Sequence, residues 1–131
     1  MKILIIDNDV STVTTLKALI MSQGDFNIDV AYNGRSGLAK MAETPDYDVV
    51  LLDIMMPEIS GMQVCETMAG DNRMRDIPVL LMSSALPISP AEFRESLSKS
   101  DKLSVIKGVL EKPFTTDALL SEIRRVARKQ I

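Results

Sequence analysis

The sequence contains no histidine, no tryptophan and only one cysteine among its 131 residues. Without histidine, neither a Ser-His nor a Cys-His catalytic pair can form, and the usual general base is missing. Because Cys65 is the only cysteine, an internal disulfide is impossible, and zinc or iron–sulfur sites are not expected. The chemistry of this chain must therefore use carboxylates, hydroxyls and amines.

An excess of basic charge is also missing. The chain has 15 Lys and Arg against 18 Asp and Glu, a formal net charge of -3, which argues against direct binding of nucleic acid by this domain. The apolar stretch Ile3 to Ile6 stops at Asp7, far short of a signal-peptide core or a membrane span. We therefore expect a cytoplasmic protein without membrane contact, and the length predicts one domain, residues 1–131.

Short apolar runs alternate with helical patterns along the chain. Three unbroken runs are typical of strands buried on both faces. With one alternating and one weaker segment, the strand candidates are 3–6, 26–30, 49–52, 79–82 and 105–110. The helix candidates are 13–20, 38–42, 62–68, 91–99 and 119–126. In the fourth helix, Phe93 and Leu97 should point inward. Five strand–helix alternations predict an α/β fold with a doubly wound, five-stranded parallel sheet.

Local signals mark the boundaries of several elements. Ser11 or Asp9 is placed to cap the first helix, and Thr115 or Thr116 the last one, because their side-chain oxygens can accept the first backbone N–H groups of a helix. The dipeptide Asn33-Gly34 indicates a turn.

Polar side chains follow the predicted strands at the point where each strand ends. If the sheet has the order 2-1-3-4-5, the first and third strands are neighbours at its switch point, where open α/β sheets bind ligands. The strand-end residues would then face one shallow pocket. They are Asp7, Asn8, Asp9, Asp53, Ser83 and Lys112.

Carboxylates gathered at one edge need a compensating charge. Two unit charges about 4 Å apart repel by on the order of 4 kcal/mol at an effective dielectric constant near 20. A hard divalent cation offsets this repulsion, and Mg²⁺ fits a site with few carboxylates and an incoming phosphate. With such a cation, Lys112 and Ser83 can hold the oxygens of a phosphoryl group. Asp53 is then the candidate nucleophile, accepting phosphate as an acyl phosphate.

Four motifs in the right order and spacing, IIDND, DIMMPEISG, PVLLMSS and EKPF, resemble the receiver domain of two-component response regulators. The resemblance covers essentially all 131 residues in register. It implies a flavodoxin-like (βα)5 fold of the chemotaxis-regulator kind, with the sheet order 2-1-3-4-5 and no output domain in this chain. It also implies a phosphorylation-controlled signalling switch, not an enzyme, whose surface around strands 4 and 5 regulates a downstream protein or a fused output domain.

The resemblance assigns phosphorylation and metal binding to particular residues. Asp53 would accept the phosphoryl group from a phosphohistidine on a histidine kinase or a histidine phosphotransfer protein. Mg²⁺ would be bound by Asp7, by Asn8, by Asp53 and by the backbone carbonyl of Met55. The receiver would thereby promote its own phosphorylation and dephosphorylation.

The resemblance also assigns the groups around the phosphate. Ser83 takes the place of the switch Ser/Thr, and Lys112 takes that of the phosphate-binding lysine, whose bond to Pro113 is commonly cis in the family.

Two positions and one interval depart from the family pattern. Asn8 stands where the family usually has a second acid, which lowers the expected Mg²⁺ affinity, and Asp9 is the candidate to compensate through a water. Val109 replaces the aromatic switch residue, so the usual hydroxyl-to-aromatic coupling must be altered or absent. The interval between Ser83 and Lys112 is several residues longer than is typical, which affects the expected readout face.

Two other functions remain open at this point. A receiver-fold interaction module that no longer uses phosphate is motivated by Asn8 and Val109. A haloacid-dehalogenase-type phosphatase would use the D-x-D spacing, with Asp7 as nucleophile and Asp9 as acid/base. Against the phosphatase, the chain lacks the adjacent pair of late acids that this family needs.

Overall fold

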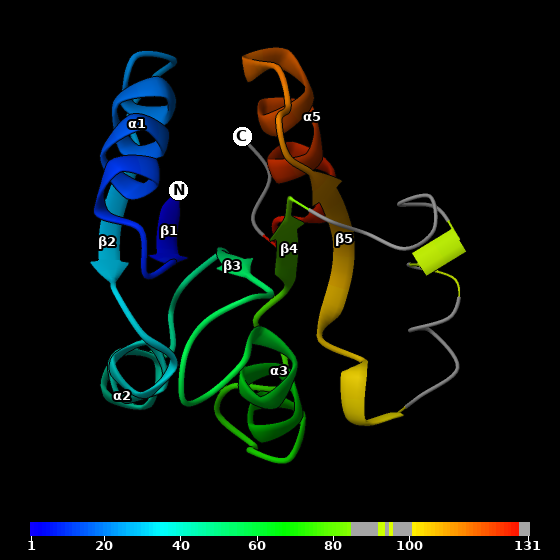
Figure 1. Ribbon diagram of the computed structural model, residues 1–131. Coiled ribbons are helices and arrows are strands. Elements are labelled where there is room, and N and C mark those ends of the chain that lie inside the picture. Colours follow the sequence, from blue (N-terminus) through cyan, green and yellow to red (C-terminus); the bar gives the residue numbers. More distant parts are fainter. Residues whose placement is uncertain (85–91, 94, 96–100, 129–131) are drawn as a thin grey trace.

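The computed structural model describes residues 1–84, 92, 93, 95 and 101–128. One parallel sheet has the order β2-β1-β3-β4-β5, which confirms the predicted fold (Figure 1). Its strands are β1 (Lys2–Ile6), β2 (Asn27–Ala31), β3 (Val49–Asp53), β4 (Val79–Ser83) and β5 (Ile106–Glu111). The described helices are α1 (Val10–Met21), α2 (Gly34–Glu43), α3 (Gly61–Ala69), α5 (Thr116–Val126) and the short 3-10 helix η1 (Asp101–Leu103). None of these described helices has the length and hydrophobicity to cross a bilayer.

The sheet separates two apolar cores because neighbouring residues of a strand point to opposite faces. In β1, Leu4 and Ile6 join the core under α2 and α3, whereas Ile3 and Ile5 join the core under α1 and α5 (Figure 1). All four side chains are fully buried, and each stabilises the fold by about 2 kcal/mol relative to an exposed position. Burial on both faces explains why this run is unbroken instead of alternating.

Polar side chains cap the helices where the chain leaves the sheet. Asp9 caps α1, and Thr115 caps α5. Each is one of the two cap residues predicted for its helix. The Asn33-Gly34 pair behaves differently from the predicted turn. Gly34 is the first residue of α2, and the Asn33 side chain accepts a hydrogen bond from the Ser36 N–H at 2.8 Å. An Asn can serve either purpose, and here the helix uses it as a cap.

The predicted helix of residues 91–99 lies largely outside the described residues, and Leu97 is among those not described. Residues 92, 93 and 95 have helical backbone. Phe93 is half-buried and packs against the core under α2 and α3, as predicted. Part of the long interval between Ser83 and Lys112 forms η1, which packs against α3.

The loop after β3 returns to the end of its own strand at Gly61. The Gly61 N–H donates a hydrogen bond of 2.9 Å to the Ile54 carbonyl. A Cβ atom at Gly61 would lie 2.5 Å from the Asp53 carbonyl oxygen and 2.9 Å from the Ile54 Cα. Because both obstacles are backbone atoms, only glycine lets α3 begin this close to Asp53. Within the same loop, Glu58 has a left-handed φ of 65°.

We predict that Gly61→Ala lowers the free energy of unfolding by about 1–3 kcal/mol, since the backbone around Asp53 must shift to make room. Urea denaturation measures the change. Gly70→Ala is the matched control, because the nearest atoms to a Cβ there lie at 3.7 and 3.8 Å, and its effect should stay within about 0.5 kcal/mol. Equal losses in the two variants would contradict the packing argument.

Candidate functional site

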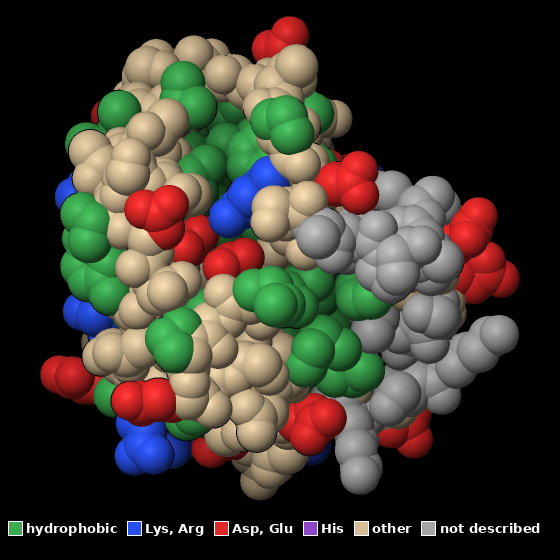
Figure 2. Space-filling model, viewed as in Figure 1, with side chains coloured by type: hydrophobic (Ala, Val, Ile, Leu, Met, Phe, Trp, Pro, Cys, Tyr) green, Lys and Arg blue, Asp and Glu red, His purple; other side chains and the backbone are tan. Residues whose placement is uncertain are grey.

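Asp53 is the last residue of β3, and its side chain lies at the edge of the sheet where the strands end. The residue is only 8% exposed. The next residue, Ile54, donates its N–H to the Met82 carbonyl at 3.0 Å, which holds the end of β3 against β4. Figure 2 shows acidic and basic side chains meeting in a shallow hollow near the centre of this face.

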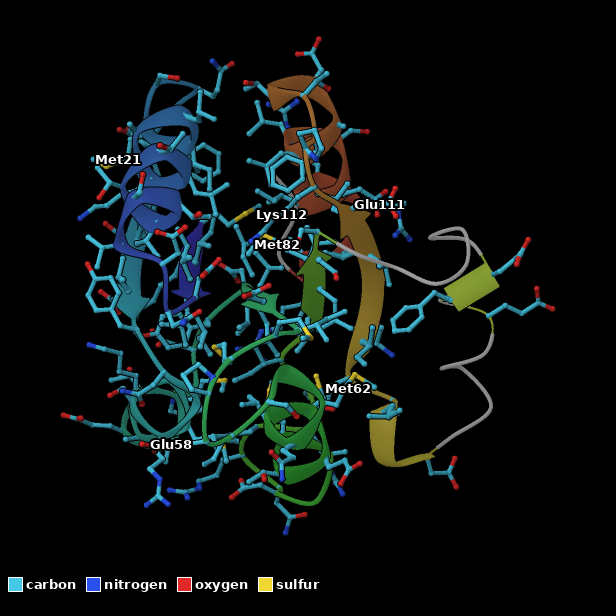
Figure 3. The ribbon with its side chains drawn as sticks, viewed as in Figure 1. Met21, Glu58, Met62, Met82, Glu111 and Lys112 are labelled. Atoms are coloured by element: carbon cyan, nitrogen blue, oxygen red, sulfur yellow. The ribbon has the colours of Figure 1, made fainter. Side chains whose placement is uncertain are left out.

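The Lys112 ammonium connects two carboxylates that are far apart in the sequence. Its Nζ lies 3.2 Å from Asp7 Oδ2 and 3.7 Å from Asp53 Oδ1. Figure 3 labels Lys112 on the side of β5 that faces β1. Asp7 is 1% exposed, so its ionised carboxylate requires this partner. The predicted gathering of the ends of β1, β3 and β5 is therefore present in the structure.

Ser83 ends β4 and is 1% exposed. Its carbonyl oxygen accepts the Lys112 N–H at 2.7 Å, so the backbone ties the ends of β4 and β5 together. The Lys112-Pro113 peptide bond is cis, as the family resemblance implied. Beside it, a groove of about 320 Å³ between α1 and the β5–α5 loop is lined by Leu16, Leu19, Lys112, Pro113 and Phe114, among others.

Burial raises the pKa of Asp53 above its ordinary value, and this is the largest influence on the group. The Lys112 ammonium acts in the opposite direction, and the Asp7 carboxylate adds to the increase. A backbone hydrogen bond from Met55 also lowers the pKa, without reversing the net direction. The ionised Asp53 is thus unfavourable in the metal-free fold and would gain from an added cation.

The remaining predicted ligands lie at the rim of the site. Asn8 is exposed, and Met55 is 72% exposed. The Met55 thioether is too soft a ligand for Mg²⁺, so its backbone carbonyl is the candidate ligand. Asp9 is exposed and caps α1, where its carboxylate accepts hydrogen bonds from the Ser11 N–H at 3.1 Å and the Thr12 hydroxyl at 2.8 Å. These bonds lower the pKa of Asp9, with the Thr12 hydroxyl the largest influence. Sequence reasoning missed Thr12, although a hydroxyl three residues after a cap is a usable signal.

The oxygen ligands present fit a magnesium ion. Within residues 1–84, 92–93, 95 and 101–128, no group of three or more His, Cys, Asp or Glu could hold a metal. The site has two carboxylates, from Asp7 and Asp53, and both lie close to the Lys112 ammonium. The Asn8 amide and the Met55 carbonyl complete a set of hard oxygen donors, which Mg²⁺ uses together with water and phosphate.

Val109 lies away from the site on β5. It is 6% exposed and belongs to the core under α2 and α3, against which Phe93 also packs. The position is therefore filled by an aliphatic side chain in the core.

Comparisons with known proteins agree with this architecture. The family model described as "Response regulator receiver domain" matches residues 3–124. The DNA-binding dual master transcriptional regulator RpaA of Synechocystis is 28% identical over 128 residues, covering 98% of this chain and 49% of that protein. The chain thus spans about half the length of the curated relatives it matches.

Solved structures share the fold. Chemotaxis protein CheY4 of Vibrio cholerae has a TM-score of 0.78 and 26% identity, covering 95% of this chain and 97% of that one. The receiver domain of sensor histidine kinase PA1611 from Pseudomonas aeruginosa, described with a magnesium ion in its active site cleft, has a TM-score of 0.78. It is 19% identical and covers 95% of each chain, which is a likeness of fold alone.

We predict that Asp53→Asn increases the free energy of unfolding at pH 7 in metal-free buffer. The raised pKa of Asp53 means that the folded state disfavours the ionised carboxylate relative to the unfolded chain. The gain should shrink as the pH falls through the raised pKa towards the ordinary value of 3.8, because the wild-type carboxyl then becomes protonated. Urea denaturation at several pH values measures both effects.

Asp46→Asn is the control, for which we expect the free energy of unfolding to change in the opposite direction. Asp46 is exposed, and a hydrogen bond from Lys2 lowers its pKa, so this replacement should remove a small stabilisation that is present above pH 3.8. A lower free energy of unfolding for Asp53→Asn than for the wild type at pH 7 would contradict the electrostatic interpretation.

Proposed function

The chain belongs to the response regulator receiver domain family of two-component signalling, and from that premise we propose that it is a phosphorylation-controlled switch with Asp53 as the phosphoacceptor. The observation that carries the proposal is the placement of Asp53 and Asp7 around the Lys112 ammonium at the carboxyl edge of the sheet. Members of this family are signalling proteins and not classical enzymes. The phosphatase alternative is less well supported, because the Asp9 carboxylate that it would use as acid/base is engaged as the cap of α1.

The proposed reaction transfers a phosphoryl group from a phosphohistidine on a histidine kinase or a histidine phosphotransfer protein. The donor's N–P bond breaks and a bond forms between phosphorus and an Asp53 carboxylate oxygen, while the electron pair leaves with the imidazole nitrogen. Lys112, 3.7 Å from Asp53, supplies positive charge to the transferred oxygens. The Ser83 hydroxyl, at the end of the adjacent strand, would donate a hydrogen bond to the same oxygens.

Four groups of this chain would hold Mg²⁺ during the transfer: the carboxylates of Asp7 and Asp53, the Asn8 amide oxygen and the Met55 carbonyl. When bound, the ion neutralises charge on the phosphoryl oxygens. The neighbour described with magnesium in its active site cleft supports this assignment. The raised pKa of Asp53 supports it as well, because burial disfavours the ionised carboxylate and a bound cation would favour it.

The proposed output is a change of the surface around β4 and β5. A phosphoryl group on Asp53 would draw Ser83 inward, and the bond from Lys112 N–H to the Ser83 carbonyl would couple β4 to β5. Phosphate then shifts a pre-existing equilibrium between two conformations. The receiver, which we place in the cytoplasm, would act on a downstream protein or a fused output domain, without contacting nucleic acid or membrane itself.

A second candidate is an interaction module of the same fold that does not use phosphate. Two observations favour it: Asn8 leaves the site with two carboxylates, and Val109 is buried in the core where a switch aromatic is usual. This module would bind its partner equally well as wild type and as Asp53→Asn, and it would have no measurable Mg²⁺ affinity.

We expect the wild-type protein to gain one acid-labile phosphoryl group when it is incubated with a small phosphodonor such as phosphoramidate and Mg²⁺. Asp53→Asn should gain none, because the carboxylate nucleophile is missing, and chelation of the metal should suppress the reaction. Intact-protein mass spectrometry measures the added mass. Asp46→Asn, an exposed aspartate at the opposite edge of the sheet, is the control. Equal labelling of wild type and Asp53→Asn would rule out the proposed phosphoacceptor.

Asn8→Asp should raise the affinity for Mg²⁺ by about tenfold, equivalent to about 1.4 kcal/mol, because it adds a third carboxylate to the set. The same change should lower the stability of the metal-free protein through repulsion with Asp7. Isothermal titration calorimetry measures the affinity. Asn27→Asp makes the same chemical change at exposed Asn27, the first residue of β2, at the opposite end of the strands, and should leave the affinity unchanged. If both variants bind Mg²⁺ as the wild type does, Asn8 is not a ligand position.

A further inference from the structure

Each polar group of Asp9 forms a hydrogen bond. Its two carboxylate oxygens accept from the Ser11 N–H and the Thr12 hydroxyl. Its carbonyl oxygen accepts from the Val13 N–H at 3.0 Å. Its own N–H donates to Asp7 Oδ1 at 3.0 Å. The residue therefore joins the first turn of α1 to the carboxylate at the end of β1.

The bond to Asp7 completes the surroundings of a buried carboxylate. Asp7 Oδ2 accepts from the Lys112 ammonium at 3.2 Å, so the N–H of residue 9 and the ammonium each hold one of its two oxygens. The backbone N–H of Asp7 donates to the Ala31 carbonyl at 3.1 Å. With the backbone tied to β2, the orientation of the carboxylate depends on these two donors.

We propose that Asp9 is a positioning residue. By capping α1, its side chain fixes the backbone N–H that orients the Asp7 carboxylate for the metal and for Lys112. The proposal rests on the function proposed above, and it assigns to Asp9 a geometric role instead of a ligand role. Its negative charge is then dispensable, whereas its capping oxygen is not.

The two roles can be separated because asparagine caps a helix about as well as aspartate and carries no charge. Asp9→Asn should keep the cap and the position of its N–H. Asp9→Ala should lose the cap, so the first turn of α1 and the N–H of residue 9 become less ordered. Asn33→Ala is the matched control: it removes a cap of the same kind from α2, where the lost partner is the Ser36 N–H.

Two kinds of measurement distinguish these variants. In metal-free protein, amide hydrogen exchange monitored by NMR should be about tenfold faster at residue 9 in Asp9→Ala and near the wild-type rate in Asp9→Asn. The carboxyl ¹³C signal of Asp7 should move in Asp9→Ala alone. In titration calorimetry, Asp9→Ala should weaken Mg²⁺ binding by about tenfold, the cost typical of losing support behind a metal ligand. Asp9→Asn and Asn33→Ala should bind like the wild type.

Two results would overturn the proposal. Asp9→Asn weakening Mg²⁺ binding as much as Asp9→Ala would show that the charge of Asp9 acts on the metal. An unchanged exchange rate and Asp7 signal in Asp9→Ala would show that the cap does not orient Asp7. If the wild type itself binds no Mg²⁺, the proposed function fails, while the metal-free NMR measurements still decide the role of Asp9.

Discussion

One ammonium group shared by two buried carboxylates is the interaction on which the site depends. Lys112 comes from the end of β5, Asp7 from the end of β1 and Asp53 from the end of β3, and the three meet only because the sheet is parallel. All carboxyl ends then lie at one edge, where helix caps and loops leave room for polar groups. Without the lysine, the fold would bury two negative charges without compensation.

The same arrangement places opposing influences on the Asp53 carboxyl group. Burial raises the pKa of Asp53 more strongly than Lys112 lowers it, so the surroundings disfavour the ionised carboxylate. A divalent cation or a phosphoryl group with its metal changes this balance directly. A site whose charge balance changes on binding is suited to a switch, because binding can then shift the equilibrium between conformations.

Two departures from the family pattern act at different levels. Asn8 changes the charge of the ligand set, whereas Val109 changes the packing of β5 against its neighbours. Phe93, which packs against the same core as Val109, comes from the long interval before β5. Asn8 therefore bears on the proposed chemistry at Asp53, whereas Val109 bears on the packing of β5.

Short apolar runs and motif spacing are local features, and they predicted the strands and the polar residues at their ends, whereas the order of the strands came from the family resemblance. The sequence left Asp9 open as a helix cap or a water-mediated ligand, and it predicted a turn at Asn33, where the structure has a helix cap. The local conformation decides which donors reach each side chain: the Asp9 carboxylate accepts from the Ser11 N–H and the Thr12 hydroxyl, two and three residues further along the chain. Tertiary structure also decided that Lys112 contacts Asp7 more closely than Asp53, since such distances arise only when separate strands are packed side by side.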